Sequence, residues 1–241
     1  MTSTKATVLV DLGCIFVHPL VGYQRMIGES SVSLARVLSS SFWMDYETGR
    51  IGEDECFTQV AGLYGFQVED LRAIVYNLRE TLTFNENMLS TLREMKRTPG
   101  VTIALVSNIS EPEYHALRRR WDDSFWSVFD HIFTSWMLGV RKPSLRFYQH
   151  VLRATRAAPR ECLLIDDQPE NVLTAMSLGM HGLVGAIDLS RNLNDFVSGP
   201  IGRGLAFLRQ NASELYSTTT EGDSIDENYA QLLILEVTKD E

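Results

Sequence analysis

Residues 162–186 read CLLIDDQPENVLTAMSLGMHGLVGA, and they carry the clearest signal of the fold. The apolar run at 162–165 predicts a buried strand, and the pattern over 169–178 predicts a helix. Gly179 follows, a residue type that often ends helices, and a second apolar run occupies residues 182–186. A strand, a helix and another strand in this order are typical of a parallel sheet that is buried on both faces.

Other apolar runs extend this pattern through the rest of the chain. We expect further strands over residues 6–10, 101–106 and, more weakly, 131–136. Ser110 is a candidate N-cap for a helix over residues 112–120, and another helix is expected over residues 144–155. The alternation predicts an α/β fold with a doubly wound parallel sheet.

Residues 11–100 interrupt the alternation, because they hold no strong strand signal and read mostly as helix. Helical patterns cover residues 31–38, 53–64, 68–83 and 86–96. Ligands of open α/β sheets bind at the carboxyl ends of the strands, so a helical cap inserted there would close over the site. We predict a core of residues 1–17 and 86–216, a cap of residues 18–85, and a linker with an apolar tail at 217–241.

Two apolar features have more than one interpretation. The aromatic residues of the cap either line a substrate pocket or form the core of the cap itself: Phe42, Trp43, Phe57, Tyr64 and Phe66. In the tail, residues 229–237 form an apolar run that must pack on something. It packs on its own domain, or it contacts another domain or a second copy of the chain.

The composition limits the classes of partner. Lys and Arg number 22 against 31 Asp and Glu, a net charge of −9, which argues against nucleic acid as a partner. The basic run at residues 118–120 is too short to change this. No apolar run is long enough to span a membrane, and no signal-peptide pattern is seen. With three cysteines (Cys14, Cys56 and Cys162) and no disulfide framework, a reducing, cytoplasmic location is expected.

Polar residues follow four of the strand signals. They are Asp11, Ser107 with Asn108, Lys142, and Asp166 with Asp167. Alone, each has an ordinary explanation as a helix cap, a turn or a surface charge. In this order, the topology brings them to one edge of the sheet.

The combination indicates metal-assisted phosphate chemistry. Three close carboxylates do not all stay ionised without a cation, and hard oxygen ligands suit Mg²⁺. Lys142 and Ser107 can hold phosphate oxygens, and Asp11 can attack phosphorus to give an aspartyl-phosphate.

These residues resemble the four motifs of the haloacid dehalogenase-like superfamily over roughly residues 6–190. Asp11 matches the nucleophile and Ser107 the second motif. Lys142, in LGVRKPSLRFYQHVL, matches the third, and Asp166 and Asp167, in LLIDDQPENVLTAMSLGM, match the fourth. The stretches around the last two motifs look most like sugar-phosphate phosphatases and the phosphatase domain of soluble epoxide hydrolase.

The resemblance implies a set of ligands for Mg²⁺. The Asp11 side chain, the Gly13 carbonyl and Asp167 would bind the ion, with Asp166 assisting directly or through water. Asn171 would brace the loop of the fourth motif. Dehalogenases of the superfamily lack the paired acids of this motif, so Asp166 and Asp167 argue for phosphate and against halide.

Gly13 departs from the pattern of the family's phosphatases. They usually carry a second Asp there, which protonates the leaving group and then activates water, a contribution of about 10²–10⁴-fold. Three interpretations remain open. The leaving group needs no acid, as in a diphosphate or an anomeric phosphate; another residue such as His18 or Cys14 substitutes; or the domain binds phosphate with little turnover.

A narrower resemblance concerns residues 166–170 (DDQPE) and the tail NYAQLLILEVT. Both look like the haloacid dehalogenase-like half of fungal bifunctional sesquiterpene cyclases and their stand-alone relatives. This implies a prenyl or drimanyl diphosphate as substrate and a substrate contact for Glu170, which is otherwise an ordinary acid in the first turn of a helix. The Asp-x-Asp-Thr-Thr motif of the cyclase half does not occur in this sequence.

We therefore expect a Mg²⁺-dependent phosphatase acting on a small organic phosphate, which includes terpenyl mono- and diphosphates. Asp11, Ser107 and Lys142 are the expected catalytic residues, and substrate contacts are expected from Ser107, Asn108, Lys142 and Glu170. Two alternatives are a catalytically weak binding module and a lyase-type domain that ionises a prenyl diphosphate.

Overall fold

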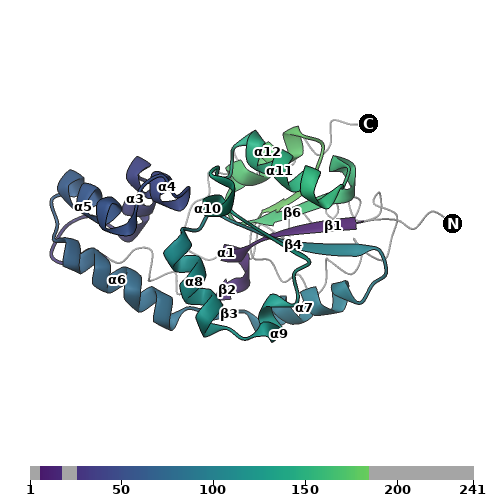
Figure 1. The fold of residues 1–241 in the computed structure, drawn as a ribbon, viewed down its shortest axis with the longest axis horizontal. Coiled ribbons are helices and arrows are strands. Elements are labelled where there is room, and N and C mark those ends of the chain that lie inside the picture. The colour runs from purple at the N-terminus through teal and green to yellow at the C-terminus, as the bar shows by residue number, and fades with distance from the viewer. Residues whose placement is uncertain (1–5, 18–25, 185–241) are drawn as a thin grey trace, which may run out of the picture. The chain divides into compact units, whose positions relative to one another are not determined.

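A computed structural model describes residues 6–17 and 26–184, which lie within one compact unit, Lys5–Ala186. Five parallel strands form its main sheet in the order β5-β4-β1-β6-β7 (Figure 1). The strands are β1 (Ala6–Asp11), β4 (Val101–Ser107), β5 (His131–Thr134), β6 (Cys162–Asp166) and β7 (His181–Val184). The predicted doubly wound parallel sheet is confirmed.

Helices cover both faces of this sheet. On one face α11 (Leu145–Thr155) and α12 (Pro169–Ser177) pack in a single buried cluster with Leu9 of β1 and Leu164 of β6. On the other side lie α7 (Glu86–Lys96), α8 (Glu111–Arg120) and the short α9 (Asp123–Trp126), as Figure 1 shows. Because both faces are covered, the central strands β1, β4 and β6 are mostly apolar up to the polar residue at each carboxyl end.

The predicted helix ends near the sheet are confirmed. Ser110 is the N-cap of α8, where its Oγ accepts a hydrogen bond from the Glu113 backbone N–H. Gly179 follows α12 with a φ of 85°, a left-handed conformation that favours glycine. At Gly182 a Cβ would lie 2.4 Å from Val172 Cγ1, so the absence of a side chain lets α12 pack closely on β7.

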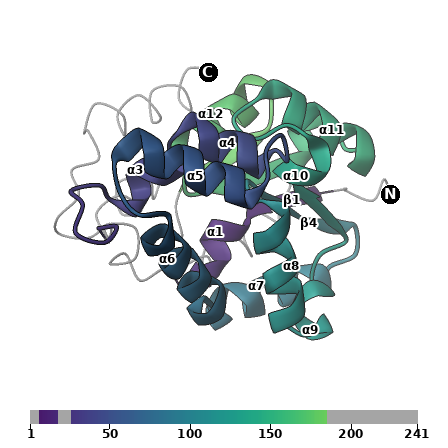
Figure 2. The same cartoon turned by 60° about the vertical axis from the view of Figure 1, so that its left-hand side comes forward.

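Four helices between β1 and β4 have a hydrophobic core of their own. They are α3 (Leu34–Leu38), α4 (Ser41–Glu47), α5 (Glu53–Tyr64) and α6 (Val68–Thr81), seen together in Figure 2. We call residues 34–81 the helical insert. Phe57 is fully buried in its core and Trp43 nearly so, while Phe42, Tyr64 and Phe66 pack partly buried against it.

Several predicted boundaries in this region were wrong. The helix expected over residues 31–38 begins only at Leu34, because Ser33 caps it, and α4 was missed. The helix expected to reach residue 83 ends at Thr81, because residues 83–84 join a ribbon. This antiparallel ribbon, β2 (Phe16–Val17) with β3 (Thr83–Phe84), lies in the region expected to lack strands.

Other differences are shorter. The third strand was expected to reach residue 136 but ends at Thr134, which caps the short helix α10 (Ser135–Leu138). The remaining short elements are α1 (Leu12–Ile15) and a 3₁₀ turn at Pro159–Glu161. Of the described helices, none has the length and apolarity to cross a membrane. His18, residues 185–186 of the expected fifth strand, and the tail at 229–237 lie outside the described residues.

Candidate active site

The carboxyl ends of three neighbouring strands bring the predicted site residues together. Asp11 ends β1, Ser107 ends β4 and Asp166 ends β6, and the parallel register places these ends at one edge of the sheet. Lys142 comes from the loop between α10 and α11, and its ammonium lies among them. The structure thus brings these four residues together, three of them from strand ends and Lys142 from a loop.

Lys142 is the buried centre of the cluster. Its Nζ donates to Asp11 Oδ1 at 2.6 Å, to Asp166 Oδ2 at 2.5 Å and to the Val106 carbonyl at 3.3 Å. Its side chain is 1% exposed. Burial alone would lower the pKa of Lys142, but the carboxylates of Asp11 and Asp166 outweigh it and raise that pKa. The side chain is therefore a permanent cation.

The Asp11 carboxyl group is also held on its second oxygen. Asp11 Oδ2 accepts the Gly13 backbone N–H at 2.6 Å. Burial raises the pKa of Asp11 to about 7; Lys142 opposes this shift, and Asp166 and Asp167 add to it. A Cβ on Gly13 would lie 2.5 Å from Asp11 Oδ2. The Asp11 carboxylate thus occupies the space that a side chain at position 13 would need.

The acids at this edge fit a hard cation. Oxygens of Asp11 and Asp167 and the Cys14 sulfur lie within 4.8 Å of one another. Burial raises the pKa of the Cys14 thiol well above its ordinary value, so it stays protonated and is a poor ligand. Two carboxylates with open positions suit Mg²⁺, which prefers oxygen ligands and keeps several waters. The assignment of Asp11, Gly13 and Asp167 to this ion stays a prediction.

Asp166 has other partners. Its Oδ2 accepts from Lys142, and its Oδ1 accepts the Gln168 backbone N–H at 2.9 Å and Asn171 Nδ2 at 2.8 Å. Asn171 is itself fixed, because Tyr148 Oη donates to the Asn171 backbone carbonyl at 2.8 Å. In this arrangement Asp166 positions Lys142 and the loop after β6, and its predicted contact with the metal stays untested.

Asn108 also acts on Lys142. Its Nδ2 donates to the Lys142 carbonyl at 3.0 Å, and its Oδ1 accepts the Lys142 backbone N–H at 2.8 Å. Both polar atoms of the amide are therefore used to clamp the backbone that carries the catalytic candidate. The Ser107 side chain is buried at the neighbouring strand end.

A cavity of about 650 Å³ opens onto this cluster. Its polar end includes Asp11, Ser107, Asn108, Lys142, Asp167 and Glu170. Its apolar wall comes mostly from the helical insert: Leu34, Ala35, Leu38, Trp43, Met44, Val75, Leu78 and Leu82. Of the five cap aromatics, Trp43 is the one that lines this cavity, so the apolar wall is largely aliphatic rather than aromatic.

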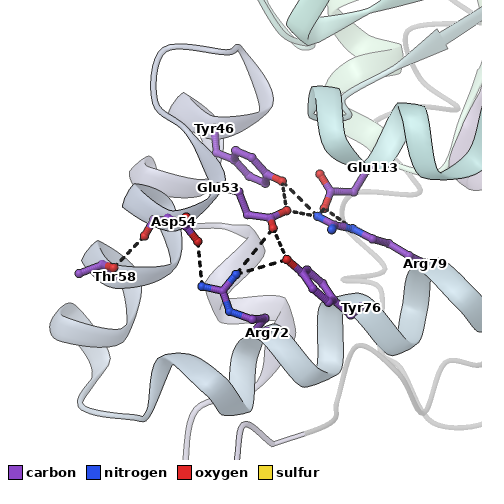
Figure 3. A network of polar contacts seen from close by, with 8 residues as sticks. All are labelled: Tyr46, Glu53, Asp54, Thr58, Arg72, Tyr76, Arg79 and Glu113. Carbon is purple, nitrogen blue, oxygen red and sulfur yellow. Dashed lines mark hydrogen bonds and ion pairs between the residues drawn. The ribbon is translucent and has the colours of Figure 1, made fainter.

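Charged residues in the cavity wall were missed by the sequence reasoning. Arg79 of α6 pairs with Glu53 of α5 and with Glu113 of α8, and its Nη2 also contacts the Tyr46 hydroxyl (Figure 3). This network joins the helical insert to the core. In the sequence, Arg79 and Glu113 look like ordinary charges at helix ends, so no local pattern marks them.

A second missed pair lies beside Lys142. Arg141 Nε donates to Glu47 Oε2 at 2.9 Å, and both residues line the cavity. Glu47, at the end of α4, is 9% exposed and also accepts Trp43 Nε1 at 3.2 Å. Burial raises the pKa of Glu47, while Arg141 and Trp43 oppose that shift.

A family model described as haloacid dehalogenase-like hydrolase matches residues 32–179, more than half of the chain. The chain belongs to the haloacid dehalogenase-like hydrolase family. The predicted family and enzyme class are thereby confirmed. A second model, the sesquiterpene cyclase astC-like C-terminal domain, matches residues 201–241, which lie outside the described residues.

Two curated relatives come from fungi. They confirm the narrower resemblance, to fungal sesquiterpene cyclases and their stand-alone relatives. Drimenol cyclase drtB of Aspergillus calidoustus is 34% identical over 215 residues, which are 88% of this chain and 40% of the cyclase. Sesquiterpene phosphatase astK of Aspergillus oryzae is 33% identical over 183 residues, which are 76% of this chain and 90% of the phosphatase. The chain therefore spans well under half of the first relative and most of the second.

The fold is also found among solved structures. A HAD-like family hydrolase from Porphyromonas gingivalis superposes with a TM-score of 0.60 at 22% identity, covering 76% of this chain and 91% of that one. At this identity the likeness concerns the fold alone.

Proposed function

We propose that the protein is a Mg²⁺-dependent phosphatase that acts through an aspartyl-phosphate on Asp11. One observation carries the proposal: the Asp11 carboxylate ends a central strand, 2.6 Å from the Lys142 ammonium and in one cluster with Asp167. A carboxylate fixed in this way is a competent nucleophile for phosphoryl transfer. Membership of the hydrolase family and the phosphatase relative support this function.

The residues of the cluster divide the chemistry between them. Asp11 attacks phosphorus, and Ser107 and Lys142 hold the phosphoryl oxygens as their charge changes. When bound by Asp11 and Asp167, Mg²⁺ stabilises the negative charge on the phosphoryl oxygens. Water then attacks the phosphorus of the aspartyl-phosphate, which releases phosphate and restores the carboxylate.

The cavity favours a substrate with a long hydrocarbon chain, and we propose a terpenyl phosphate or diphosphate. Its aliphatic wall, which includes Leu38, Val75 and Leu78, faces the same space as the phosphate site. A volume of about 650 Å³ is in the usual range for small-molecule sites. Two of the curated relatives are named a drimenol cyclase and a sesquiterpene phosphatase, which agrees with this substrate class.

The test of this function is phosphate release from a panel of substrates with and without Mg²⁺. The panel holds sugar phosphates, a nucleotide, an aryl phosphate, and farnesyl mono- and diphosphate. We expect metal-dependent release concentrated on the farnesyl substrates. Release that is equal for all members, or unaffected by removal of the metal, would contradict the proposal.

Asp167→Ala removes a carboxylate of the predicted metal site. We expect it to raise the Mg²⁺ concentration needed for half-maximal activity by about 10-fold or more, because a ligand of a hard cation is lost. Titration of activity against Mg²⁺ measures the shift. As a control, Asp123→Asn at the start of α9 changes an acid that does not line the cavity and should leave the titration unchanged. An identical curve for Asp167→Ala would remove this residue from the metal site.

Leu78→Ala tests the apolar wall. The shorter side chain leaves part of the hydrocarbon without contact, so kcat/KM for a farnesyl substrate should fall by about 10-fold or more. The value for a sugar phosphate should change little, because such a substrate does not reach the insert. Leu63→Ala, at a leucine of α5 that is 57% exposed, is the matched control. Equal losses on both substrates would indicate a general effect on the insert instead of substrate contact.

A lyase function is a second candidate, favoured by the 34% identity to a drimenol cyclase. In that case the chain ionises a prenyl diphosphate to a carbocation instead of hydrolysing it. Product analysis distinguishes the two, since phosphate with an unrearranged alcohol or monophosphate indicates hydrolysis. Pyrophosphate with a cyclised hydrocarbon indicates the lyase.

A further inference from the structure

The basic side chains of the cavity wall differ in how many of their donors are already used. Within the described residues three cations line the cavity: Arg79, Arg141 and Lys142. All three protons of the Lys142 ammonium have acceptors, on Asp11, on Asp166 and on a backbone carbonyl.

Arg79 is also occupied by its own network. Its Nε donates to Glu113, and its Nη2 contacts Glu113, Glu53 and the Tyr46 hydroxyl (Figure 3). Its two carboxylate partners more than balance its charge. Arg79 is therefore a structural tie between α5, α6 and α8, with its charge balanced inside the protein.

Arg141 is different. Its Nε donates to Glu47, and neither of its Nη groups has a hydrogen-bond partner among the described residues. Its side chain is 26% exposed, enough for a ligand to reach it. It is adjacent to Lys142 in the chain and lines the same cavity. A guanidinium whose Nη groups are not used within the protein is suited to bidentate contact with phosphate oxygens.

The position of Arg141 is built into the structure. Glu47, which holds its Nε at 2.9 Å, is buried and is held in turn by Trp43. Ser135 Oγ donates to the Glu47 backbone carbonyl at 2.6 Å, and Ser135 Oγ in turn accepts the Ile109 backbone N–H at 3.0 Å. The end of α4 is thereby tied to the loop that follows Ser107. Arg141 is thus pre-organised beside the loop that follows Ser107 and the loop that carries Lys142.

We propose that Arg141, positioned by Glu47, binds the second phosphate of an organic diphosphate. The inference rests on the proposed function and deepens it, because it selects diphosphates over monophosphates. Asp11 attacks the terminal phosphorus, and Arg141 holds the inner phosphate that becomes the leaving group. Ser107 holds the phosphoryl group in transfer, and the positive charge of Lys142, which stays bound to Asp11 and Asp166, stabilises it.

The step balances without a general acid. A bond forms between an Asp11 oxygen and the terminal phosphorus, and the bond from that phosphorus to the bridging oxygen breaks. The electron pair stays on the bridging oxygen, which leaves as part of an organic monophosphate. The second pKa of a phosphate is about 6, so this group leaves as a dianion near pH 7 and needs no proton. Charge stabilisation by Arg141 takes the place of the acid that Gly13 cannot supply.

Binding of two inorganic probes tests the inference without turnover. Pyrophosphate and inorganic phosphate are titrated by calorimetry, with Mg²⁺ present, into Asp11→Asn and into Asp11→Asn combined with Arg141→Gln. In the first protein we expect pyrophosphate to bind about 10-fold more tightly or better, because a second phosphate reaches the guanidinium. The added Arg141→Gln should abolish that advantage and leave the affinity for phosphate within about 3-fold.

Kinetics supply the matching test. Arg141→Gln should lower kcat/KM for farnesyl diphosphate by about 10²-fold and for farnesyl monophosphate by less than about 3-fold. Arg146→Gln is the matched control, since this arginine of α11 is exposed and does not line the cavity. It should leave both values unchanged.

Three results would overturn the inference: equal binding of the two probes, equal losses on both substrates, or a wild-type protein that hydrolyses monophosphates alone. The failure of the proposed function looks different. In that case the wild-type protein releases phosphate from no substrate, while the pyrophosphate titration still reports whether Arg141 binds a second phosphate.

Discussion

Asp11→Asn should lower phosphate release by about 10³-fold or more, since an amide cannot serve as the nucleophile that a carboxylate provides. Asparagine has nearly the same shape, and its oxygen can still accept from Lys142 Nζ, which lies 2.6 Å from Asp11 Oδ1. The fold should therefore persist. Phosphate release and thermal unfolding, measured on the same preparation, check the two halves of this expectation.

A matched control for this substitution is Asp45→Asn. Asp45 forms an ion pair with Arg50 at 2.9 Å on the surface of the insert and does not line the cavity. Asp45→Asn should leave turnover unchanged, because exposed ion pairs contribute little to the stability of the fold. Wild-type turnover by Asp11→Asn would remove Asp11 from the role of nucleophile, whatever the substrate.

Lys142→Met should destabilise the protein strongly as well as inactivate it. The substitution removes the cation between Asp11 and Asp166, which are both buried, so two carboxylates lose their partner. Breaking a buried ion pair in this way typically costs about 3–5 kcal/mol. Urea unfolding measures the free energy of unfolding, and phosphate release measures the loss of activity.

Two further variants show that the loss comes from the unpaired charge. Lys142→Met combined with Asp166→Asn should be less destabilised than the sum of the two single changes, because the second substitution removes one of the orphaned carboxylates. Lys96→Met serves as control, since Lys96 pairs with Asp130 at 3.0 Å on the surface and its loss should cost about 1 kcal/mol or less. Strict additivity at Lys142 and Asp166 would contradict the coupling described here.

The sequence predicted those parts of the site that depend on strand ends. Asp11, Ser107 and Asp166 each follow an apolar run, and parallel topology brings such residues together whatever the loops do. Lys142 was placed after the third expected strand and matched to a family motif, and its ammonium contacts Asp11 and Asp166. Chemistry that is fixed by topology and by short-range spacing can thus be read from one sequence.

Other features depend on contacts that no local pattern records. Arg141 and Glu47 are 94 residues apart in the chain, and their pairing depends on how α4 meets the core. The ribbon of β2 and β3 was missed because strands of two residues carry no periodic signal. The sequence left two interpretations of the cap aromatics open, and Phe57 fits the second, because the helices of the insert need a core of their own.

The absence of an acidic side chain at Gly13 should have a consequence for the kinetics of the reaction. The family's second Asp also activates the hydrolytic water, so a chain with Gly13 should break down its aspartyl-phosphate slowly. The covalent intermediate should then accumulate, and the first product should appear in a burst before steady turnover.

The measurement that tests the central claim most directly is trapping of this intermediate. Wild-type protein is mixed with farnesyl diphosphate and Mg²⁺, quenched in acid during turnover, and digested for mass spectrometry. We predict a phosphoryl group on Asp11, in an amount that matches the burst and that is absent from Asp11→Asn. A burst of product with the phosphoryl group on another residue, or with none on Asp11, would contradict the account.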